Sequence, residues 1–475
     1  MIRPEGQPIL TAAAMRAAEN RAIAAGSSVL DLIERAGAGA AEAVRRLAAG
    51  APVLVICGPG KNGGDGYVAA RVLKEGGADV RVAALAEPKT EAASLARARW
   101  AGPVEAFADC APAPILVDAL FGTGSRALDA AVGDRLAALV SAAQLSFAVD
   151  LPSGIDGDRG GDAGALDLVG YDLTLALGAL KPAHVLEPTA EHCGALRVIE
   201  IGLDLMTQPA REASRDWTIA PPWVAPPYRF DHKYSRGLVI VLGGAMSGAA
   251  ALASEAAMHA GAGYVMLFAD EAAGDTPHAL VGRRWSAEAF TNTLDGKRPD
   301  KTVVVVGPGL GKDDAAQAKL TAALGGAHKL VIDGDALHLL DDAAFTRIKA
   351  RSGTVVLTPH AGEFKALFGD YTGSKIEAAR DAAVRSGAVV VFKGSDTVVA
   401  YPDGRTRVSL GASAWLSTAG TGDVLAGTIA TMLVADTPSP AEAGVWMHGE
   451  AARRLGGAFI ADDLARALVA VRATL

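Results

Sequence analysis

The stretch Pro52-Val-Leu-Val-Ile-Cys-Gly-Pro-Gly-Lys-Asn-Gly-Gly-Asp-Gly66 sets the expected fold of the chain. Its first part, Pro52–Cys57, is an apolar run without polar alternation, which is typical of a parallel strand buried on both faces. The glycine-rich segment Gly58–Gly66 follows, and a helical pattern over Tyr67–Lys74 comes next. The order of strand, glycine turn and helix predicts the start of a doubly wound α/β unit.

The same alternation continues through the first half of the chain. Ala-rich helical stretches such as Ala130–Ala143 separate further apolar runs, which are Val80–Leu85, Ile115–Leu120, Ser146–Leu151, Leu173–Leu177 and Arg197–Ile201. Strands that alternate with helices in this way form parallel sheets covered on both faces. Before them, Ala12–Ala25 and Val29–Leu47 show helical spacing, and we expect these helices to pack on the sheet or on another subunit.

The second half follows the same pattern. Its apolar runs are Leu238–Leu242, Tyr264–Phe268, Thr302–Val306, Leu330–Asp333, Val355–Thr358 and Val389–Phe392. Two further runs, Thr397–Tyr401 and Arg405–Leu410, flank Pro402-Asp403-Gly404, which predicts a β-hairpin. The halves share a structural class but no sequence period, so they are not repeats.

A proline-rich segment separates the two halves. Ala220-Pro-Pro-Trp-Val-Ala-Pro-Pro-Tyr228 holds four prolines, which exclude a helix or a central strand because proline lacks a backbone donor. We therefore predict two α/β domains, residues 1–215 and 229–475, joined by a linker over 216–228.

Composition excludes several classes of protein. The chain has 475 residues, half of them apolar, and a net charge of −8, which argues against disorder and against charge-driven binding of nucleic acid. No apolar run approaches the roughly 20 residues of a membrane helix. The chain does not open with a basic segment followed by an apolar run. We therefore expect no signal peptide, and we expect a cytoplasmic location. The three cysteines form no Cys-x-x-Cys pair, which disfavours a zinc site or a disulfide framework.

Three strand ends of the first half carry both glycine and an acid. They are Gly58–Gly66, the segment Val117–Gly124 with Asp118, and the segment Val149–Asp156 with Asp150. Ligands of open parallel sheets lie beyond the carboxyl ends of the strands, so we expect one shared site there. The formal Gly-x-Gly-x-x-Gly pattern is a weak signal alone. Lys181 follows the fifth strand, and either a place in this crevice or a surface salt bridge fits it.

The second half contains a predicted anion site. In Ser417–Gly427, Gly420 and Gly422 open a helix over Val424–Leu433, and free amides at a helix N-terminus stabilise phosphate. Asp423 lies where the phosphate would arrive, so it is a candidate base for an attacking hydroxyl; its alternative is an acid that only stabilises the helix. His360 fits a structural or a catalytic role equally. Asp333 and Asp335 fit indirect magnesium binding or helix capping.

The first-half motifs resemble the NAD(P)H-hydrate epimerase family over about residues 8–210. The resemblance implies a Rossmann-like α/β/α sandwich and a potassium ion held by Asn62, Asp118 and Ser153. It also implies substrate contacts at Asn62, Gly63, Gly64, Asp65, Gly66, Gly122, Thr123, Gly124, Ser125, Arg126, Ala127, Leu128 and Asp150, and Asp150 is our candidate acid/base. Lys61 stands where this family often has asparagine.

The second half, over about residues 228–472, resembles the ribokinase-like superfamily and, within it, ADP/ATP-dependent NAD(P)H-hydrate dehydratases. The matching segments are Asp231–Lys233, Gly307–Gly311, Thr358–Glu363, Lys393-Gly394 and Ala419–Asp423. The resemblance implies hydrate contacts at Ala249, Gly309, His360 and Asp423. It places an adenine nucleotide, with Mg²⁺, on Lys393, Gly394, Ser395, Asp396, Thr397 and Gly422.

Together the two resemblances imply a repair activity on hydrated NADH and NADPH. The first domain would interconvert the R and S hydrates, and the second would dehydrate the S hydrate with ADP or ATP. The resemblance to fused bacterial forms favours ADP, and relatives of both domains self-associate, so a homo-oligomer is expected. The alternative is a vitamin-precursor or sugar kinase joined to a nucleotide-binding module, and a structural scaffold is the least favoured class.

Overall fold

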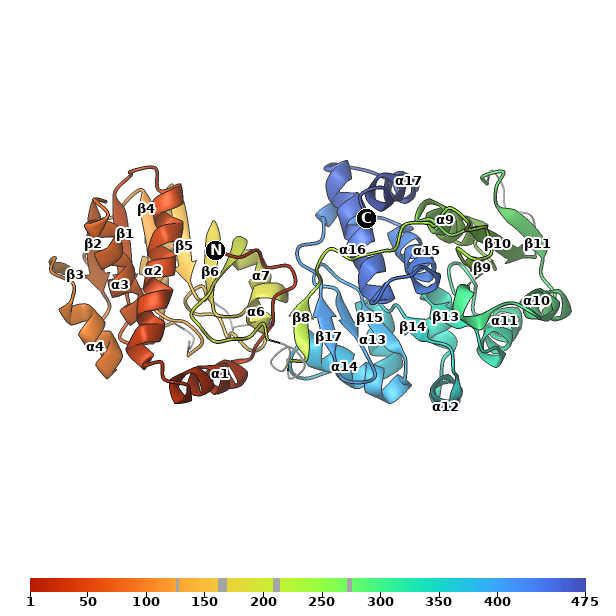
Figure 1. Ribbon diagram of the computed structural model, residues 1–475, viewed down its shortest axis with the longest axis horizontal. Helices are drawn as coiled ribbons and strands as arrows, with labels where there is room; N and C mark the ends of the chain where they lie inside the picture. Colours follow the sequence, from red (N-terminus) through yellow and green to blue (C-terminus); the bar gives the residue numbers. More distant parts are fainter. Residues whose placement is uncertain (125–127, 161–168, 208–213, 271–275) are drawn as a thin grey trace. The chain divides into compact units, whose positions relative to one another are not determined.

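The computed structural model describes residues 1–124, 128–160, 169–207, 214–270 and 276–475. The chain forms two compact units, Met1–Thr218 and Ile219–Leu475, and Figure 1 draws their helices and strands. Both units have the predicted α/β class, with parallel sheets covered by helices. No helix in the described part of the chain is long and apolar enough to cross a membrane.

The first unit is built on a parallel sheet with the strand order β3-β2-β1-β4-β5-β6-β7. From the boundary between β1 and β4, the strands follow chain order outward on both sides, β1 to β3 on one side and β4 to β7 on the other. This is the strand order of a doubly wound fold. The strands are β1 (Val53–Cys57), β2 (Val80–Ala84), β3 (Val104–Ala106), β4 (Ile115–Ala119), β5 (Leu145–Val149), β6 (Leu173–Leu177) and β7 (Ala195–Ile199). A further strand, β8 (Asp216–Thr218), ends the unit.

Helices cover both faces of this sheet. They are α1 (Ala12–Ala24), α2 (Val29–Leu47), α3 (Lys61–Glu75), α4 (Glu91–Ala98), α5 (Ala130–Ala142), α6 (Pro182–Val185) and α7 (Thr189–His192). The apolar face of α2 packs with α3 in the core of this unit, and Figure 1 shows the two helices side by side. We predicted that this helix packs either on the sheet or on another subunit. In the structure it packs within its own unit.

The sheet of the second unit follows the order β11-β10-β9-β12-β13-β14-β15-β16-β17. Strands β9 to β15 pair in parallel, whereas β15, β16 and β17 form antiparallel pairs, which confirms the hairpin. The strands are β9 (Leu238–Leu242), β10 (Tyr264–Ala269), β11 (Val281–Arg284), β12 (Thr302–Val306), β13 (Lys329–Ile332), β14 (Val355–Leu357), β15 (Val389–Phe392), β16 (Val398–Ala400) and β17 (Thr406–Val408).

Its longer helices are α9 (Ser247–His259), α10 (Ala287–Leu294), α11 (Asp314–Gly325), α12 (Asp342–Ala350), α13 (Ala361–Phe368), α14 (Lys375–Ser386), α15 (Thr421–Val434), α16 (Pro440–Leu455) and α17 (Ala461–Arg472). Three short 3₁₀ turns are η1 (Pro299–Lys301), η2 (Gly334–Leu339) and η3 (Ala414–Leu416). Helix α15 is buried along almost its whole length and packs against α9 and α16, so it is the central helix of this unit.

The proline-rich segment lies against the second unit as extended chain. Val224 is fully buried, and the amide of Ala225 donates to the carbonyl of Asp436 at 3.0 Å. The hydroxyl of Thr437 donates to the carbonyl of Trp223 at 2.8 Å. These residues are therefore attached to the surface of this unit. The predicted linker 216–228 also includes β8, which belongs to the first unit.

The apolar runs predicted the long buried strands to within one or two residues. The structure adds β3, β8 and β11, which are three or four residues long; β3 and β11 are partly or largely exposed and lack an apolar run. It also begins α3 at Lys61, so Asn62–Gly66 is the first part of a helix, not a loop. All three cysteines are free and buried, as predicted.

Candidate active sites

The carboxyl ends of β1 and β4 meet at the switch point of the first sheet. A Cβ added to Gly58, which follows β1, would lie 1.8 Å from the carbonyl oxygen of Leu120, which follows β4. Only glycine permits this approach of two main chains. Beside it lies a cavity of about 320 Å³, lined by Met15, Arg16, Glu19, Val29, Leu32, Ile33, Ala36, Gly60, Lys61, Asn62, Asp65, Leu120, Phe121, Gly122, Thr123, Gly124, Asp150, Leu177, Lys181 and Ile201.

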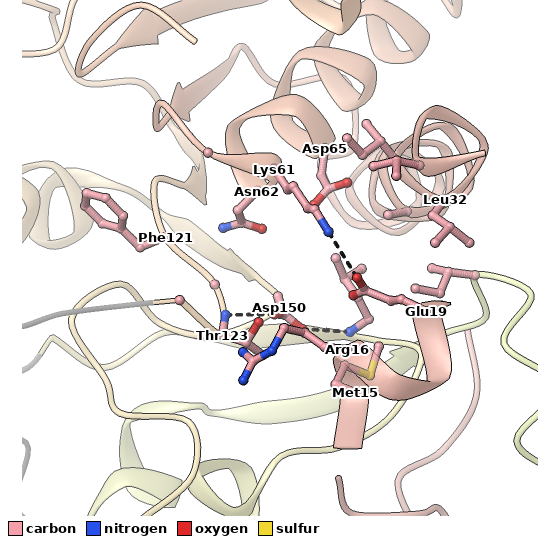
Figure 2. A pocket seen from close by; sticks show the side chains of 18 of the residues that line it. Met15, Arg16, Glu19, Leu32, Lys61, Asn62, Asp65, Phe121, Thr123 and Asp150 are labelled. Carbon is pink, nitrogen blue, oxygen red and sulfur yellow. Dashed lines mark hydrogen bonds and ion pairs between the residues drawn. The ribbon is translucent and has the colours of Figure 1, made fainter. Parts of the chain in front are cut away.

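The first turns of α3 present one polar face to this cavity. Asp65 follows Asn62 by three residues and Lys61 by four, so its side chain lies on the same side of the helix as each of them, and all three line the cavity (Figure 2). Gly63, Gly64 and Gly66 are not among the lining residues. A Cβ at Gly63 would lie 1.8 Å from the carbonyl oxygen of Gly58, and one at Gly66 would lie 2.7 Å from Cβ of Ala119. These glycines allow close packing of the helix, and their predicted substrate contacts stay predictions.

Asp150 and Lys181 form a buried ion pair in the cavity wall. The ammonium of Lys181 is fully buried and donates to Asp150 and to the carbonyls of Leu177 and Ala179, at 2.9 and 3.0 Å. Asp150 also accepts from the amide of Thr123 at 3.3 Å, drawn in Figure 2. Lys181 therefore lies in the crevice and does not form a surface salt bridge. It thereby supplies a cation to a carboxylate that burial alone would disfavour.

His184 supports the main chain of Asp150. Its Nδ1 accepts from the amide of Lys181 at 2.9 Å, so Nε2 carries the proton and donates to the carbonyl of Asp150 at 2.7 Å. Burial lowers the pKa of His184 to about 4, with the nearby Lys181 adding to the effect. Asp150 has a φ of 69°, a left-handed conformation that is uncommon for aspartate. The neutral histidine thus stabilises a strained turn at the strand end.

Asp118 is a buried carboxylate without a cationic partner among the described residues. Its oxygens accept from Ser153 Oγ at 2.9 Å, from the amide of Leu120 at 2.9 Å and from the hydroxyl of Tyr171 at 2.6 Å. Burial raises its pKa although these hydrogen bonds oppose the shift. The structure therefore joins two of the three predicted potassium ligands, Asp118 and Ser153, at a buried carboxyl that has no cationic partner among the described residues.

Asn62, the third predicted ligand, has an unsatisfied side chain. Both Oδ1 and Nδ2 are buried and have no hydrogen-bond partner among the described residues. Buried amides of native proteins nearly always have partners, so an unmatched one indicates a ligand or ion that completes the site. The oxygens of Asn62, Ser153 and Asp118 are hard donors, which suit an alkali-metal cation.

The predicted substrate loop Gly122–Leu128 is described only in part. Gly122, Thr123 and Gly124 line the cavity, whereas Ser125, Arg126 and Ala127 lie outside the described residues. Leu128 packs instead on an apolar cluster beneath the other face of the sheet. Its predicted substrate contact therefore has no support from the cavity.

The N-terminal helix contributes a wall that the motifs did not indicate. Met15, Arg16 and Glu19 of α1 line the cavity, and Lys61 Nζ lies 3.1 Å from a carboxylate oxygen of Glu19 (Figure 2). Their spacing within Ala12–Ala24 fits one helical face, but nothing in the sequence shows which element that face contacts. Lys61, the departure from the family pattern, thus forms an ion pair across the cavity.

In the second unit, Asp423 lies in the first turn of α15. Gly420 precedes the helix with a φ of 88°, a left-handed conformation that glycine adopts at little cost. Burial raises the pKa of Asp423 to about 7, and the charges of Asp333, Asp335 and Glu363 add to it, while Lys393 opposes it. A carboxyl with this pKa can accept and release a proton near neutral pH.

Lys393, after β15, is the cation of this site. Its ammonium donates to Asp333 at 2.8 Å and lies 3.8 Å from Glu363. Burial disfavours its charge, but Asp333, Glu363 and Asp423 outweigh that effect and raise the pKa of Lys393. The hydroxyl of Thr358 donates to Asp333 at 2.6 Å, and Asp333 makes no capping hydrogen bond to η2. Asp335 accepts from the amide of Gly311 at 3.0 Å.

The structure brings two of the predicted hydrate contacts together at the ends of β9 and β12. A Cβ at Gly309 would lie 3.0 Å from Cβ of Ala249 and 2.4 Å from the carbonyl of Met246. His360 caps α13, accepting at Nδ1 from the amides of Gly362 and Glu363 at 3.0 and 3.2 Å. This is the structural role foreseen for His360, and its exposed ring leaves the catalytic alternative open.

The predicted nucleotide segment follows β15. Gly394 and Ser395 are exposed, whereas Asp396 and Thr397 are buried, and Lys375 of α14 forms an ion pair with Asp396. Thr397 Oγ1 donates to the carbonyl of Gly394 at 2.7 Å. A Cβ at Gly422 would lie 3.4 Å from Lys393 Nζ, so the start of α15 lies beside this segment. Across the described residues, no three His, Cys, Asp or Glu side chains are placed to hold a metal ion.

Comparisons with known proteins agree with the two predicted resemblances. A family model described as NAD(P)H-hydrate dehydratase matches residues 239–470, and one described as YjeF-related protein N-terminus matches residues 29–183. A bifunctional NAD(P)H-hydrate repair enzyme of Mycobacterium tuberculosis is 36% identical over 395 residues, which cover 82% of this chain and 80% of that protein. The chain belongs to the bifunctional NAD(P)H-hydrate repair enzyme family.

Other bifunctional NAD(P)H-hydrate repair enzymes match over almost the whole chain. The protein of Pyrobaculum aerophilum is 34% identical, covering 96% of both chains, and that of Gloeobacter violaceus is 35% identical, covering 93% and 92%. The Bacillus subtilis ADP/ATP-dependent NAD(P)H-hydrate dehydratase, co-crystallised with ATP/Mg2+, has 24% identity and a TM-score of 0.44, covering 56% of this chain and 97% of that one. The matches favour this family over the alternative of a kinase joined to a nucleotide-binding module.

Proposed function

We propose that this chain repairs hydrated NADH and NADPH. The first unit interconverts the R and S hydrates, and the second dehydrates the S hydrate with ADP or ATP. Family membership supports the pair of activities. The observation that carries the second activity is Asp423, a carboxyl with a pKa of about 7 in the first turn of a buried helix, beside Lys393.

The dehydration needs a better leaving group than hydroxide. The hydrate carries a hydroxyl on the carbon next to the ring nitrogen, and transfer of a phosphoryl group to it gives a phosphate that leaves with help from the nitrogen lone pair. Loss of a proton from the neighbouring ring carbon then restores the ring double bond. Asp423 accepts the hydroxyl proton during the phosphoryl transfer. The amides of Ala419–Gly422 face the transferring group at the helix start, where they stabilise its charge.

The nucleotide is proposed to lie on Lys393–Thr397 and Gly422, with the hydrate against Ala249, Gly309 and His360. Magnesium bound to the phosphates would neutralise their charge, because Mg²⁺ is often held by one or two carboxylates and substrate phosphates. The donor set fits this arrangement: Asp333 and Asp335 offer carboxylates near Asp423. Lys393 is positioned by Asp333 to meet a phosphate.

The epimerisation is proposed to take place in the cavity of the first unit. Loss of the hydroxyl gives a ring iminium, and water then adds to the other face. Potassium held by Asn62, Asp118 and Ser153 would supply a fixed positive charge to the site. The unsatisfied amide of Asn62 and the buried, uncompensated carboxylate of Asp118 fit such an ion.

One experiment tests the whole proposal. The chain is incubated with a mixture of the R and S hydrates of NADH and with ADP or ATP, and the absorbance of the reduced nicotinamide is followed. Recovery of both hydrates as NADH is the expected result. Recovery of neither hydrate, or accumulation of a stable phosphoester, would contradict it. A cytoplasmic location, self-association and a preference for ADP also stay proposals.

A further inference from the structure

Two carboxyl groups reach the cavity of the first unit from different walls. Asp65 comes from the second turn of α3, whereas Asp150 follows β5. Figure 2 shows Asp65 on the helix wall and Asp150 on the wall of the strand ends, beside Thr123. Both residues are largely buried, with exposures of 5% and 7%.

The surroundings of the two carboxyls are opposite in kind. Asp150 accepts from the ammonium of Lys181 and from the amides of Thr123 and Leu177, both at 3.3 Å. The side chain of Asp65 makes no hydrogen bond or ion pair with any residue that the structure describes. A buried carboxyl with a cation retains its charge, whereas one without a partner favours the neutral acid.

Electrostatics supports this difference. Burial raises the pKa of Asp65 well above its ordinary value, and the charges of Asp150 and Glu19 add to the rise. Lys61 and Lys181 act in the opposite direction without reversing it. A further titratable neighbour is Cys57 of β1, whose pKa burial also raises, so that its thiol stays uncharged. Arg16 of α1 lines the same cavity and adds a cationic side chain to it. The surroundings of Asp65 therefore favour its acid form, whereas Asp150 lies in an ion pair with Lys181.

An exchange of hydroxyl between the two faces of a ring can use an acid on one side and a base on the other. Departure of the hydroxyl needs a proton donor on one face, and addition of water needs a proton acceptor on the other. We propose that Asp65 is a second catalytic carboxyl of the epimerase site, which protonates the departing hydroxyl while Asp150, on the facing wall, takes the proton of the adding water. This inference rests on the proposed epimerisation.

The step balances without any oxidant or further reactant. The bond from carbon to hydroxyl oxygen breaks, the hydroxyl leaves as water with the proton of Asp65, and the ring nitrogen lone pair forms a carbon–nitrogen double bond. A water oxygen then forms the new carbon–oxygen bond on the other face, the double-bond electrons return to nitrogen, and a proton passes to Asp150. Conversion of the opposite epimer runs the steps in reverse and restores both protonation states.

The test uses the full chain and the two purified hydrates of NADH. Epimerisation is followed by chromatography from the R hydrate, and nucleotide-dependent dehydration of the S hydrate reports the second unit in the same sample. Asp65→Asn should lower the kcat of epimerisation by about 10²–10⁴-fold, the usual contribution of a general acid, with KM nearly unchanged. Dehydration of the S hydrate should stay at the level of the unaltered chain.

The matched control is Asp79→Asn, which removes an exposed carboxyl of the same unit and should change neither rate. In the unaltered chain, kcat of epimerisation should fall as pH rises past the pKa of Asp65, because the acid form is needed. Asp65→Asn should lose this alkaline limb, and Asp65→Glu should retain it with a lower kcat. Melting curves show whether each variant is folded.

Two results would overturn the inference. One is an Asp65→Asn chain with unchanged kcat, or with a loss confined to KM, which would make Asp65 a binding residue. The other, which needs no variant, is a kcat of the unaltered chain that stays constant through the neutral and alkaline range. If the unaltered chain does not epimerise at all, the proposed function itself fails, which separates the two failures.

Discussion

Single charged groups in this chain take their roles from their neighbours. Asp423 and Asp118 are both acids at strand or helix ends, yet only Asp423 lies beside a lysine, Lys393, and further carboxylates. Asp118 is instead enclosed by hydroxyl and amide donors. The same residue type therefore serves as a candidate base in one place and as a candidate cation ligand in the other.

Replacement of Asp423 tests its role as a base. Asp423→Ala should abolish nucleotide-dependent dehydration while epimerisation continues. In the unaltered chain the dehydration rate should rise with pH through about 7, because the base acts in its deprotonated form. A pH series of initial rates checks this, and normal dehydration by the variant would contradict the assignment. Above pH 7, Asp423→Ala should be no less stable than the unaltered chain. The reason is that a carboxyl with a raised pKa opposes folding once it is ionised.

The ion pair of Asp150 and Lys181 can be tested by comparing the unfolding free energies of single and double variants. Lys181→Met leaves a buried carboxylate without its cation and should cost about 3–5 kcal/mol of unfolding free energy. The double variant Lys181→Met/Asp150→Asn should recover much of this loss, since no unpaired charge remains. Urea unfolding at neutral pH measures both. Equal losses in the single and double variants would show that the ion pair does not determine stability here.

At the scale of the element, the glycines of α3 are spacers. The resemblance predicted substrate contacts for Gly63, Gly64 and Gly66, whereas in the structure these residues face neighbouring main chain, Ala93 and Ala119. The helix can thereby approach β1 and β4 closely, and this approach brings Asn62 and Asp65 into the cavity. Glycine in this segment thus permits the close packing that positions these two side chains.

Alanine substitutions test this role. Gly63→Ala would place a Cβ 1.8 Å from the carbonyl oxygen of Gly58, a main-chain atom, and should cost about 1–3 kcal/mol or more. Gly60→Ala is the matched control, because its Cβ would meet no atom within 4 Å; its cost should be about 1 kcal/mol or less. Thermal unfolding of the two variants gives the comparison. Similar melting temperatures would contradict the packing explanation.

At the scale of the whole molecule, the two proposed chemistries occupy separate units. The cavity with Asn62, Asp118 and Asp150 lies wholly within Met1–Thr218, and Asp423 with Lys393 within Ile219–Leu475. Conditions that alter one site should therefore leave the other unaffected.

Removal of potassium gives the test. Exchange of K⁺ for a bulky organic cation should lower epimerisation and leave dehydration of the S hydrate unchanged, because the buried Asp118 and the unsatisfied Asn62 belong to the first unit. Rates measured in the two salts at one ionic strength check this. Asn62→Ala should reduce the difference between the salts. An equal loss of both activities would contradict the assignment of the ion to the first unit.

The sequence alone determined the α/β class, the two halves and most buried strands. The physical reason is that runs such as Leu238–Leu242 and Thr302–Val306 consist almost entirely of apolar residues, so their composition alone predicts that they are buried. It also indicated which strand ends carry acids. Exposed edge strands such as β11 escaped prediction, because edges bury too little to require an apolar run.

Only the tertiary structure decided which of these acids acquire a partner. Lys181 lies 31 residues from Asp150, and Glu19 lies 42 residues from Lys61, so neither pair is visible in sequence spacing. The same holds for the unsatisfied amide of Asn62 and the solitary carboxyl of Asp65. The charge state of a buried group depends on its surroundings in space, and packing of distant segments alone creates them.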